Sequence, residues 1–500
     1  MCSKKPRRWP HITPGFKRKM QLKAKWFFWG LAGIAIARLF SMAAMPLIDT
    51  SEPRYAEIAR LMVETGDWIT PWFEPGVPFW GKPPLSFWSQ AMGIRILGGS
   101  EFAVRFPSFL AMVALAAVLY RATAILVDRQ AARWTTIILS SMLLPLAAAG
   151  AVLTDSFFAL GITYSMLAFL IAPTAPTPFW RYGLFVGMAI GLLSKGPLAF
   201  VLVAIVLVPW LALRRDRMVH LTNLPWLTGT LVMLALTVPW YICAELKTPG
   251  FVQYFLVGEH FLRFVDAGWQ GDLYGTAHER PFGSIWIEWL LASFPWGWAG
   301  ILLGVWVVAN ASRRARARQA CRSPVVGYLA LWAVAAPTFF TFSGNILWTY
   351  VLPSLPAFAL LLAMLAKELS PAEAVPRLAR ILVITGALVP TAAISLGLVS
   401  LTAPTKLKTE KQLVAVAKSQ MSEGQKLYFV YSRPFSARFY SGGTAELIVP
   451  SELEKLSLEK GEAAFVALPN GKEFLIDESV RERLVPISKS RRYTLYKING

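Results

Sequence analysis

Charged residues are scarce in this chain, and acids are scarcer than bases. Of the 500 residues only 16% are charged while 55% are hydrophobic, and 50 Lys and Arg stand against 29 Asp and Glu. This composition excludes an ordinary soluble domain and indicates a protein with several membrane spans. The net charge of +21 would suggest nucleic acid as the partner of a soluble protein. Here the bases cluster beside apolar runs, and no nucleic-acid-binding module is visible. We therefore interpret these bases as residues that set the membrane topology and contact anionic lipid headgroups, and we exclude nucleic acid as a partner.

Cysteine is also rare. The three cysteines, Cys2, Cys243 and Cys321, have no paired spacing, which excludes a disulfide framework and a cysteine zinc site. No apolar segment precedes Cys2, so a lipoprotein signal is excluded as well.

The first apolar run follows a basic tail. Residues 1–25 contain Lys and Arg but no acid, and residues 26–47 are apolar. A cleaved signal peptide with a small-residue site at 41–44 is the alternative, but the run has the length of a span. We therefore expect an uncleaved first helix with a cytoplasmic N-terminus. Arg38 lies inside this helix, where it either snorkels or faces a polar cavity.

Ten further apolar runs follow, which predicts eleven spans in all. They lie at about 103–127, 135–152, 156–172, 182–194, 197–213, 225–243, 285–310, 324–341, 346–366 and 381–401. The clusters of Arg and Lys near 129–133, 181, 214–217, 313–322 and 367–380 all fall on one predicted side, which the positive-inside rule makes cytoplasmic. The C-terminus is then expected on the outer side.

This pattern predicts an α-helical polytopic membrane protein with three parts: a cytoplasmic tail at 1–25, a transmembrane domain at 26–401 and a small α/β domain at 402–500. The transmembrane domain carries two large outer loops, 48–102 and 244–284. In the last part, short apolar runs such as LYFVYS, AELIVP, AAFVAL and YTLYKI predict strands, and Gly442-Gly443 and Pro469-Asn470-Gly471 predict the turns between them.

The first outer loop is unusually rich in potential chemistry. Residues 53–62 and 85–94 have apolar side chains at helical spacing, which predicts two amphipathic helices lying on the membrane surface. Between them, Lys82 is followed by two prolines that would hold it in place. Asp49 and Glu52 stand where the first span leaves the membrane.

Acids and cations recur on the predicted outer side of the membrane. An acid there can act as a general base on an acceptor hydroxyl, while cations can hold a phosphate and stabilise it as a leaving group. Several candidates also have a simpler explanation: Asp155 can cap a helix, Lys195 can snorkel, and Glu259 can pair with Arg263 along a helix. The candidates are Asp49, Glu52, Arg54, Lys82, Asp155, Lys195, Glu259, His260 and Arg263.

Together these residues resemble those of the GT-C class of polyprenyl-phosphate-dependent glycosyltransferases. The chain is similar to the lipid A aminoarabinose transferases and, more distantly, to the protein O-mannosyltransferases of glycosyltransferase family 39. The resemblance covers about residues 45–300 and rests on Asp49 with Glu52-Pro53-Arg54-Tyr55-Ala56-Glu57-Ile58, on Gly66-Asp67-Trp68, Lys82-Pro83, Thr154-Asp155, Lys195-Gly196 and Glu259-His260-x-x-Arg263-Phe264.

The resemblance implies a GT-C fold in the bacterial inner membrane and inverting transfer of a sugar from a polyprenyl phosphate, such as undecaprenyl phosphate. It implies catalytic roles for Asp49, Glu52 and Asp155 and donor-phosphate contacts from Arg54, Lys82 and Lys195. Substrate contacts from Tyr55, Glu259, His260 and Arg263 are also implied. The acceptor would be lipid A, lipopolysaccharide or another glycolipid, with protein serine or threonine as the second choice.

The chain departs from the aminoarabinose transferases at two positions. Their first-loop acid stands three residues before the arginine, where this chain has Ser51, so the role passes to Asp49, which we prefer, or to Glu52. Their glutamate before Lys-Pro, implicated in metal binding, is Gly81 here, so we carry no metal over and name no cofactor. The lower span count favours a related transferase with another substrate.

Two functions from other classes compete with the transferase. A transporter or flippase would carry internal repeats and charges near the midplane of its spans. A noncatalytic assembly factor would use its charged loops to bind partners. Charges at the outer face, with lysines and arginines suited to phosphate, favour the enzyme over both.

Overall fold

The computed structural model describes residues 23–214, 217–266, 269–275, 279–369, 375–422, 424–453 and 464–498. The chain forms two compact units. The first comprises Met1–Arg38, Phe79–Ser86 and Pro107–Ala393, and the second comprises Leu39–Pro78, Phe87–Phe106 and Ile394–Gly500. Most of the first loop, apart from Phe79–Ser86, thus shares a unit with residues 394–500.

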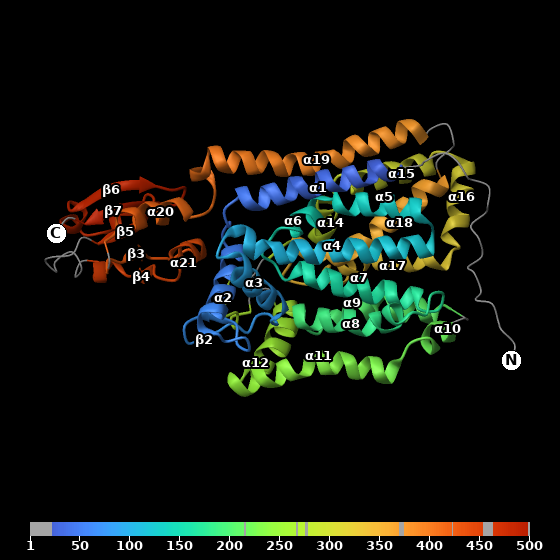
Figure 1. The fold of residues 1–500 in the computed structure, drawn as a ribbon, viewed down its shortest axis with the longest axis horizontal. Coiled ribbons are helices and arrows are strands. Elements are labelled where there is room, and N and C mark those ends of the chain that lie inside the picture. Colours follow the sequence, from blue (N-terminus) through green and yellow to red (C-terminus); the bar gives the residue numbers. More distant parts are fainter. Residues whose placement is uncertain are drawn as a thin grey trace. The chain divides into compact units, whose positions relative to one another are not determined.

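Most of the first unit is helical (Figure 1). Its elements, including the helices that continue into the second unit, are α1 (Ala24–Ala44), α4 (Glu101–Leu126), α5 (Arg129–Ser140), α6 (Leu143–Ala148), α7 (Asp155–Ile171), α8 (Pro178–Lys195), α9 (Leu198–Ala212), α10 (Arg217–Thr222), α11 (Trp226–Lys247), α12 (Phe251–Gln253), the π-helix η1 (Tyr254–Leu262), α13 (Arg263–Val265), α14 (Ser284–Ala292), α15 (Trp296–Val308), α16 (Ala311–Cys321), α17 (Pro324–Phe340), the 3-10 helix η2 (Trp348–Ser354), α18 (Leu355–Leu369) and α19 (Val375–Thr402). Each apolar run of the sequence coincides with one or two of these helices.

Within the described residues, five helices are long and apolar enough to cross a membrane, namely α1, α4, α11, η2 with α18, and the later part of α19. The count rises to seven if the bent pairs α14–α15 and α16–α17 each form one span. The expected multi-span helical architecture is therefore present, while the count of eleven is not reached by this criterion because several apolar helices are short or broken.

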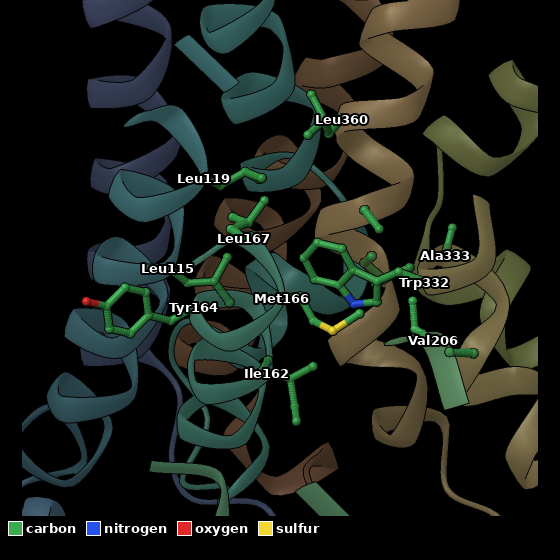
Figure 2. Close-up of a cluster of buried hydrophobic side chains, with 14 of the residues drawn as sticks. Leu115, Leu119, Ile162, Tyr164, Met166, Leu167, Val206, Trp332, Ala333 and Leu360 are labelled. Atoms are coloured by element: carbon green, nitrogen blue, oxygen red, sulfur yellow. The ribbon is translucent and has the colours of Figure 1, made fainter. Parts of the chain in front are cut away.

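The core of the first unit lies where α4, α7, α9, α17 and α18 meet (Figure 2). Leu115, Met166, Val206, Trp332 and Leu360 are fully or almost fully buried there. The Trp332 indole N–H donates to the carbonyl of Pro353 at 2.8 Å, so this large side chain leaves no unpaired donor in an apolar environment.

Helices α7 and α8 pack unusually closely because glycines line their contact. A Cβ atom at Gly187 would lie 2.5 Å from the Gly161 carbonyl oxygen, and one at Gly161 would lie 2.6 Å from the Gly187 carbonyl oxygen. Gly183, Gly187 and Gly191 follow one another at four-residue intervals, the small-residue spacing that lets helix backbones meet in membranes. The two helices run antiparallel, so the start of α7 and the end of α8 lie at the same end of the pair.

The second unit contains the C-terminal sheet and the first-loop helices. Its elements are α2 (Ser51–Thr65), the β1–β2 pair (Trp72–Glu74 and Val77–Pro78), α3 (Leu85–Leu97, which begins in the first unit), η3 (Pro404–Lys406), α20 (Lys411–Gln420), β3 (Leu427–Val430), α21 (Phe435–Ser441), β4 (Glu446–Ile448), β5 (Phe465–Pro469), η4 (Glu473–Leu475), α23 (Glu478–Arg481), β6 (Leu484–Lys489) and β7 (Tyr493–Ile498). Both predicted first-loop helices form, as α2 and α3.

The C-terminal strands form one sheet in the order β4-β3-β5-β7-β6. The pairs of β3 with β4 and with β5 are parallel, whereas β7 is antiparallel to β5 and β6. Four of the five strands coincide with apolar runs recognised in the sequence. The fifth, β6, is an edge strand with Pro486 and a largely exposed surface, so it lacks the apolar alternation that marks a strand.

Candidate functional site

A buried ion pair joins the adjacent ends of α7 and α8. The Lys195 ammonium lies 2.6 Å from the Asp155 carboxylate, and their side chains are 8% and 9% exposed. Asp155 is in the first turn of α7 and Lys195 in the last turn of α8, where each charge also complements its helix dipole. Lys195 therefore does not snorkel, and the closely packed glycines of the two helices position both groups.

The turn after Lys195 is fixed by its own geometry. Gly196 has a φ of +66°, and a Cβ atom there would lie 2.6 Å from the Phe255 ring. The two ring nitrogens of His260 lie 2.8 Å from the Lys195 carbonyl oxygen and 2.7 Å from that of Phe255. Burial lowers the pKa of His260, and the two carbonyls oppose that shift. His260 thus holds the backbone beside Lys195.

Glu259, His260 and Arg263 come from the π-helix η1 and the residue that follows it. A π-helical turn is rare and occurs often at functional sites, since it displaces side chains from their α-helical positions. The Glu259 carboxylate accepts from Arg263 at 3.0 Å and from Lys82 at 3.3 Å. Arg263 also pairs with Asp272 at 3.1 Å. The Glu259–Arg263 pair expected along a helix is therefore present, but it is one part of a larger network.

Electrostatics in this network favour the ionised carboxylate. Burial raises the pKa of Glu259, but the charges of Lys82 and Arg263 outweigh this effect and hold its pKa below the usual value. Lys82 and Arg263 are 23% and 20% exposed, whereas Glu259 is only 6% exposed. The cations therefore keep an accessible surface while their counter-ion is buried.

Aromatic side chains hold the segment that carries Lys82. The Trp80 backbone N–H donates to the Tyr274 hydroxyl at 3.0 Å, and its indole N–H donates to the Thr248 hydroxyl at 3.0 Å. The rings of Phe79 and Tyr274 lie with centroids 4.6 Å apart. These contacts tie Lys82 to the second large loop, which supplies its partner Glu259.

Tyr350 connects the two ion-pair networks. The Lys195 ammonium lies 4.8 Å from the centroid of the Tyr350 ring, and Tyr350 also interacts electrostatically with Arg263. We call the two networks together with Tyr350 the cation cluster: Lys82, Asp155, Lys195, Glu259, Arg263, Asp272 and Tyr350.

Breaking the Asp155–Lys195 pair from one side is expected to be costly. Lys195→Met leaves a buried, uncompensated carboxylate and should destabilise the protein by about 3–5 kcal/mol, while Asp155→Leu with Lys195→Met should recover much of that loss. Thermal unfolding of the single and double variants in detergent measures both effects. Additive losses in the double variant would contradict a direct buried pair.

Metal ligands do not assemble in the described ranges. There, no group of three or more His, Cys, Asp or Glu side chains could hold a metal ion. Glu259 is committed to two cations and both His260 nitrogens face carbonyls, so these residues do not fit a metal site. No step of the chemistry below is therefore assigned to a metal.

In the second unit, the Asp49 carboxylate is engaged by hydrogen bonds and an ion pair. Its carboxylate accepts from the backbone N–H of Ser436 at 2.9 Å and from the Ser436 hydroxyl, and it pairs with Arg492. Arg492 also pairs with Glu410 at 3.0 Å. The Asp49 side chain is 1% exposed, so it anchors the C-terminal sheet domain to the start of the first loop.

Glu52 forms a two-point ion pair with Arg105, at 3.1 and 2.7 Å. The Arg105 guanidinium also donates to the carbonyls of Met42, Met45 and Pro46 and is 3% exposed. This arginine therefore fixes the chain between α1 and α2. The Glu52 side chain remains 16% exposed, more than that of Asp49.

Arg54 and Tyr55 lie on α2 in the second unit. The Arg54 guanidinium lies 5.1 Å from the Tyr55 ring centroid and 5.7 Å from that of Phe435 on α21. Tyr55 packs edge-on against Phe87 with ring centroids 5.5 Å apart. The structure thus groups the predicted residues into the cation cluster with His260 in one unit, and Asp49, Glu52, Arg54 and Tyr55 in the other.

Three participants escaped the sequence-based analysis. Tyr350 and Asp272 stand in stretches without a motif, and only the fold brings them to Lys195 and Arg263. The role of Arg105 could have been inferred from the sequence, because a charge within an apolar helix needs a partner. Glu52 is the acid at the end of the neighbouring span.

Comparison with known proteins supports the resemblance. Residues 47–255 match the family model described as dolichyl-phosphate-mannose-protein mannosyltransferase. An undecaprenyl phosphate-alpha-4-amino-4-deoxy-L-arabinose arabinosyl transferase of Aeromonas hydrophila is 31% identical over 340 residues, covering 66% of this chain and 58% of the relative. The corresponding transferase 2 of Proteus mirabilis is 31% identical, covering 65% and 56%. The chain thus spans less than two thirds of the length of these relatives.

A solved structure extends the likeness to nearly the whole fold. The crystal structure of ArnT from Cupriavidus metallidurans bound to undecaprenyl phosphate matches with a TM-score of 0.76 and 18% identity, covering 95% of this chain and 98% of that one. The apo form of the same protein matches with a TM-score of 0.74. The chain is therefore a multi-pass membrane protein with the GT-C fold of ArnT, related in sequence to the aminoarabinose transferases, and its residues 47–255 match the dolichyl-phosphate-mannose-protein mannosyltransferase family.

Proposed function

We propose that this protein is a glycosyltransferase that moves a sugar from a polyprenyl phosphate to a lipid-linked acceptor at the outer face of the bacterial inner membrane. The observation that carries the proposal is the cation cluster, in which Lys82 and Arg263 share the buried Glu259 carboxylate, and Lys195 pairs with the buried Asp155 carboxylate beside the Tyr350 ring. The names of the sequence relatives, which specify undecaprenyl phosphate and an aminoarabinosyl group, agree with such a donor.

In this mechanism the cations hold the donor phosphate and stabilise it as it leaves. The acceptor oxygen attacks the anomeric carbon, its proton passes to a carboxylate base, and the bond between the anomeric carbon and the phosphate oxygen breaks. The products are the glycosylated acceptor and the polyprenyl phosphate, whose new negative charge is balanced by preorganised cations. A single in-line displacement inverts the anomeric centre. Arg54 remains a proposed further contact to the phosphate.

Asp49 and Glu52 remain the candidate bases, and Asp155 becomes a positioning residue for Lys195. The contacts of Asp49 with Ser436 and Arg492 occupy its carboxylate, whereas Glu52 is the more exposed of the two. We therefore assign the base role to Glu52 and an anchoring role to Asp49. If the acceptor is a phosphate group, its oxygen is already ionised and no base is required.

The topology in this proposal has eleven spans. The five long helices, the pair α14–α15 and the helix α17 are joined by the shorter α7, α8 and α9 and by the broken pair α5–α6. This assignment puts the N-terminus in the cytoplasm and the C-terminal sheet domain in the periplasm. Helix α16 meets α17 at 90° and carries Arg313, Arg314, Arg316 and Arg318, which suits a cytoplasmic surface helix.

The acceptor is proposed to be lipid A, lipopolysaccharide or another glycolipid. A protein hydroxyl is the second candidate, and the match of residues 47–255 to a protein mannosyltransferase family favours it. Both acceptors present an oxygen nucleophile, so the chemistry of the cation cluster serves either.

Mass spectrometry of lipid extracts from cells with and without the intact chain tests the proposal. Deletion should remove one sugar from a glycolipid while the matching polyprenyl-phosphate sugar accumulates, and restoring the chain should reverse both changes. A sugar lost from glycoproteins instead would establish the protein acceptor. Unchanged glycolipids, glycoproteins and polyprenyl-linked sugars would refute the transferase.

A further inference from the structure

A long apolar groove lies in the first unit, separate from the cation cluster. It has a volume of about 640 Å³ and lies between α1 and α4, with α5 and α6 forming its floor. None of the residues that line it belongs to the cation cluster. The groove is therefore a second feature of the same unit.

Small side chains create the groove. Ala32 and Ala35 line it from α1, and Ala116 and Ala117 line it from α4. One end is closed by Phe27 and Tyr120, whose stacked rings have centroids 5.7 Å apart. From Phe27 to Arg38 the α1 wall rises about 16 Å at 1.5 Å per residue. The dimensions suit an extended hydrocarbon chain.

Arg38 lies at the other end of the α1 wall. Its guanidinium donates to the Ala147 carbonyl oxygen at 2.7 Å, which holds it at the groove. The lining contains two arginines, Arg38 and Arg121, and no carboxylate, so its charged groups are all positive. A charge within a span helix usually marks a functional position, and here it would favour an anionic headgroup.

We propose that this groove holds an acyl chain of the lipid acceptor, with Arg38 directed to the acceptor's anionic headgroup. The inference rests on the proposed function and assigns the acceptor to the acylated, anionic glycolipids. A transferase with two lipid substrates needs two apolar tracks, and the donor phosphate already has its cations in the cation cluster.

The test compares two tryptophans on the same helix. Ala116→Trp fills the groove, whereas Ala114→Trp adds the same side chain on the exposed face of α4, outside the lining. Transfer is measured with the acylated acceptor and with its deacylated, water-soluble headgroup. Ala116→Trp should raise KM for the acylated acceptor by about tenfold or more, with KM for the deacylated acceptor and for the donor unchanged, since only chain packing is lost.

Further variants separate the outcomes. Ala35→Trp fills the groove from its other wall and should reproduce the effect. Arg38→Gln removes the headgroup contact and should raise KM for the acylated and the deacylated anionic acceptor alike, with the donor KM unchanged. An increase in the donor KM would overturn the proposal by assigning the groove to the prenyl tail. Equal KM values for Ala116→Trp and Ala114→Trp would overturn it as well.

Native mass spectrometry of the full chain distinguishes failure of the groove from failure of the function. Added acylated glycolipid should stay bound to the wild type and to Ala114→Trp but not to Ala116→Trp. If the wild type transfers no sugar to any acceptor yet shows this pattern, the transferase is refuted and the lipid groove stands. Loss of the difference between the two variants refutes the groove whatever the activity.

Discussion

Lys82→Ala is expected to lower kcat/KM for the polyprenyl-phosphate donor about 100- to 1000-fold, the loss typical of removing one preorganised charge at a developing anion. Lys82 has a partly exposed ammonium beside Glu259, and hydrogen bonds from Trp80 to Tyr274 and Thr248 hold the segment that carries it. The substitution shortens the side chain without altering these backbone contacts. Single-turnover measurements with a saturating acceptor would locate the loss in the step that breaks the bond to phosphate.

Lys426→Ala is the matched control, because Lys426 forms a similar ion pair with Glu446 at 2.7 Å on an exposed surface. Exposed pairs contribute little to stability, about 0–1 kcal/mol, so this variant should keep both its fold and its turnover. If Lys82→Ala turned over the donor as fast as Lys426→Ala, Lys82 would have no part in gripping the phosphate.

The sequence was most informative where a residue's chemistry conflicts with its surroundings. Lys195 interrupts two apolar runs and Glu259 stands in a long loop, and each forms a buried ion pair of the cation cluster. Local patterns also predicted α2, α3 and four strands of the C-terminal sheet. Helix and strand periodicity depends on neighbouring residues only, which is why these elements could be recognised from one chain.

Long-range partners could not be predicted in the same way. Asp49 was the preferred base on its position alone, and nothing local indicates that Ser436 and Arg492 occupy its carboxylate. The grouping of most of the first loop with residues 394–500 is likewise a property of the fold. Tyr350 contacts Lys195 from a 3-10 helix with no recognisable motif, so only the tertiary structure could identify it.

Glu52→Gln is expected to lower kcat about 100- to 10,000-fold for a hydroxyl acceptor, the range for loss of a general base, while Asp49→Asn should act mainly on stability. Asp49 lies 1% exposed in its contacts with Ser436 and Arg492, so its loss loosens the C-terminal sheet domain rather than the chemistry. The measurements are kcat per folded enzyme and the unfolding temperature of each variant in detergent.

Arg105→Gln separates a chemical role of Glu52 from a structural one, because it breaks the same ion pair from the other side. If Glu52 serves only to hold Arg105, the two variants should lose kcat and stability together. If Glu52 is the base, Glu52→Gln should lose far more kcat than Arg105→Gln at a comparable unfolding temperature. A large kcat loss in Asp49→Asn with an intact fold would return the base role to Asp49. Full activity in both acid variants would indicate that the acceptor is a phosphate group, whose oxygen is already ionised and needs no base.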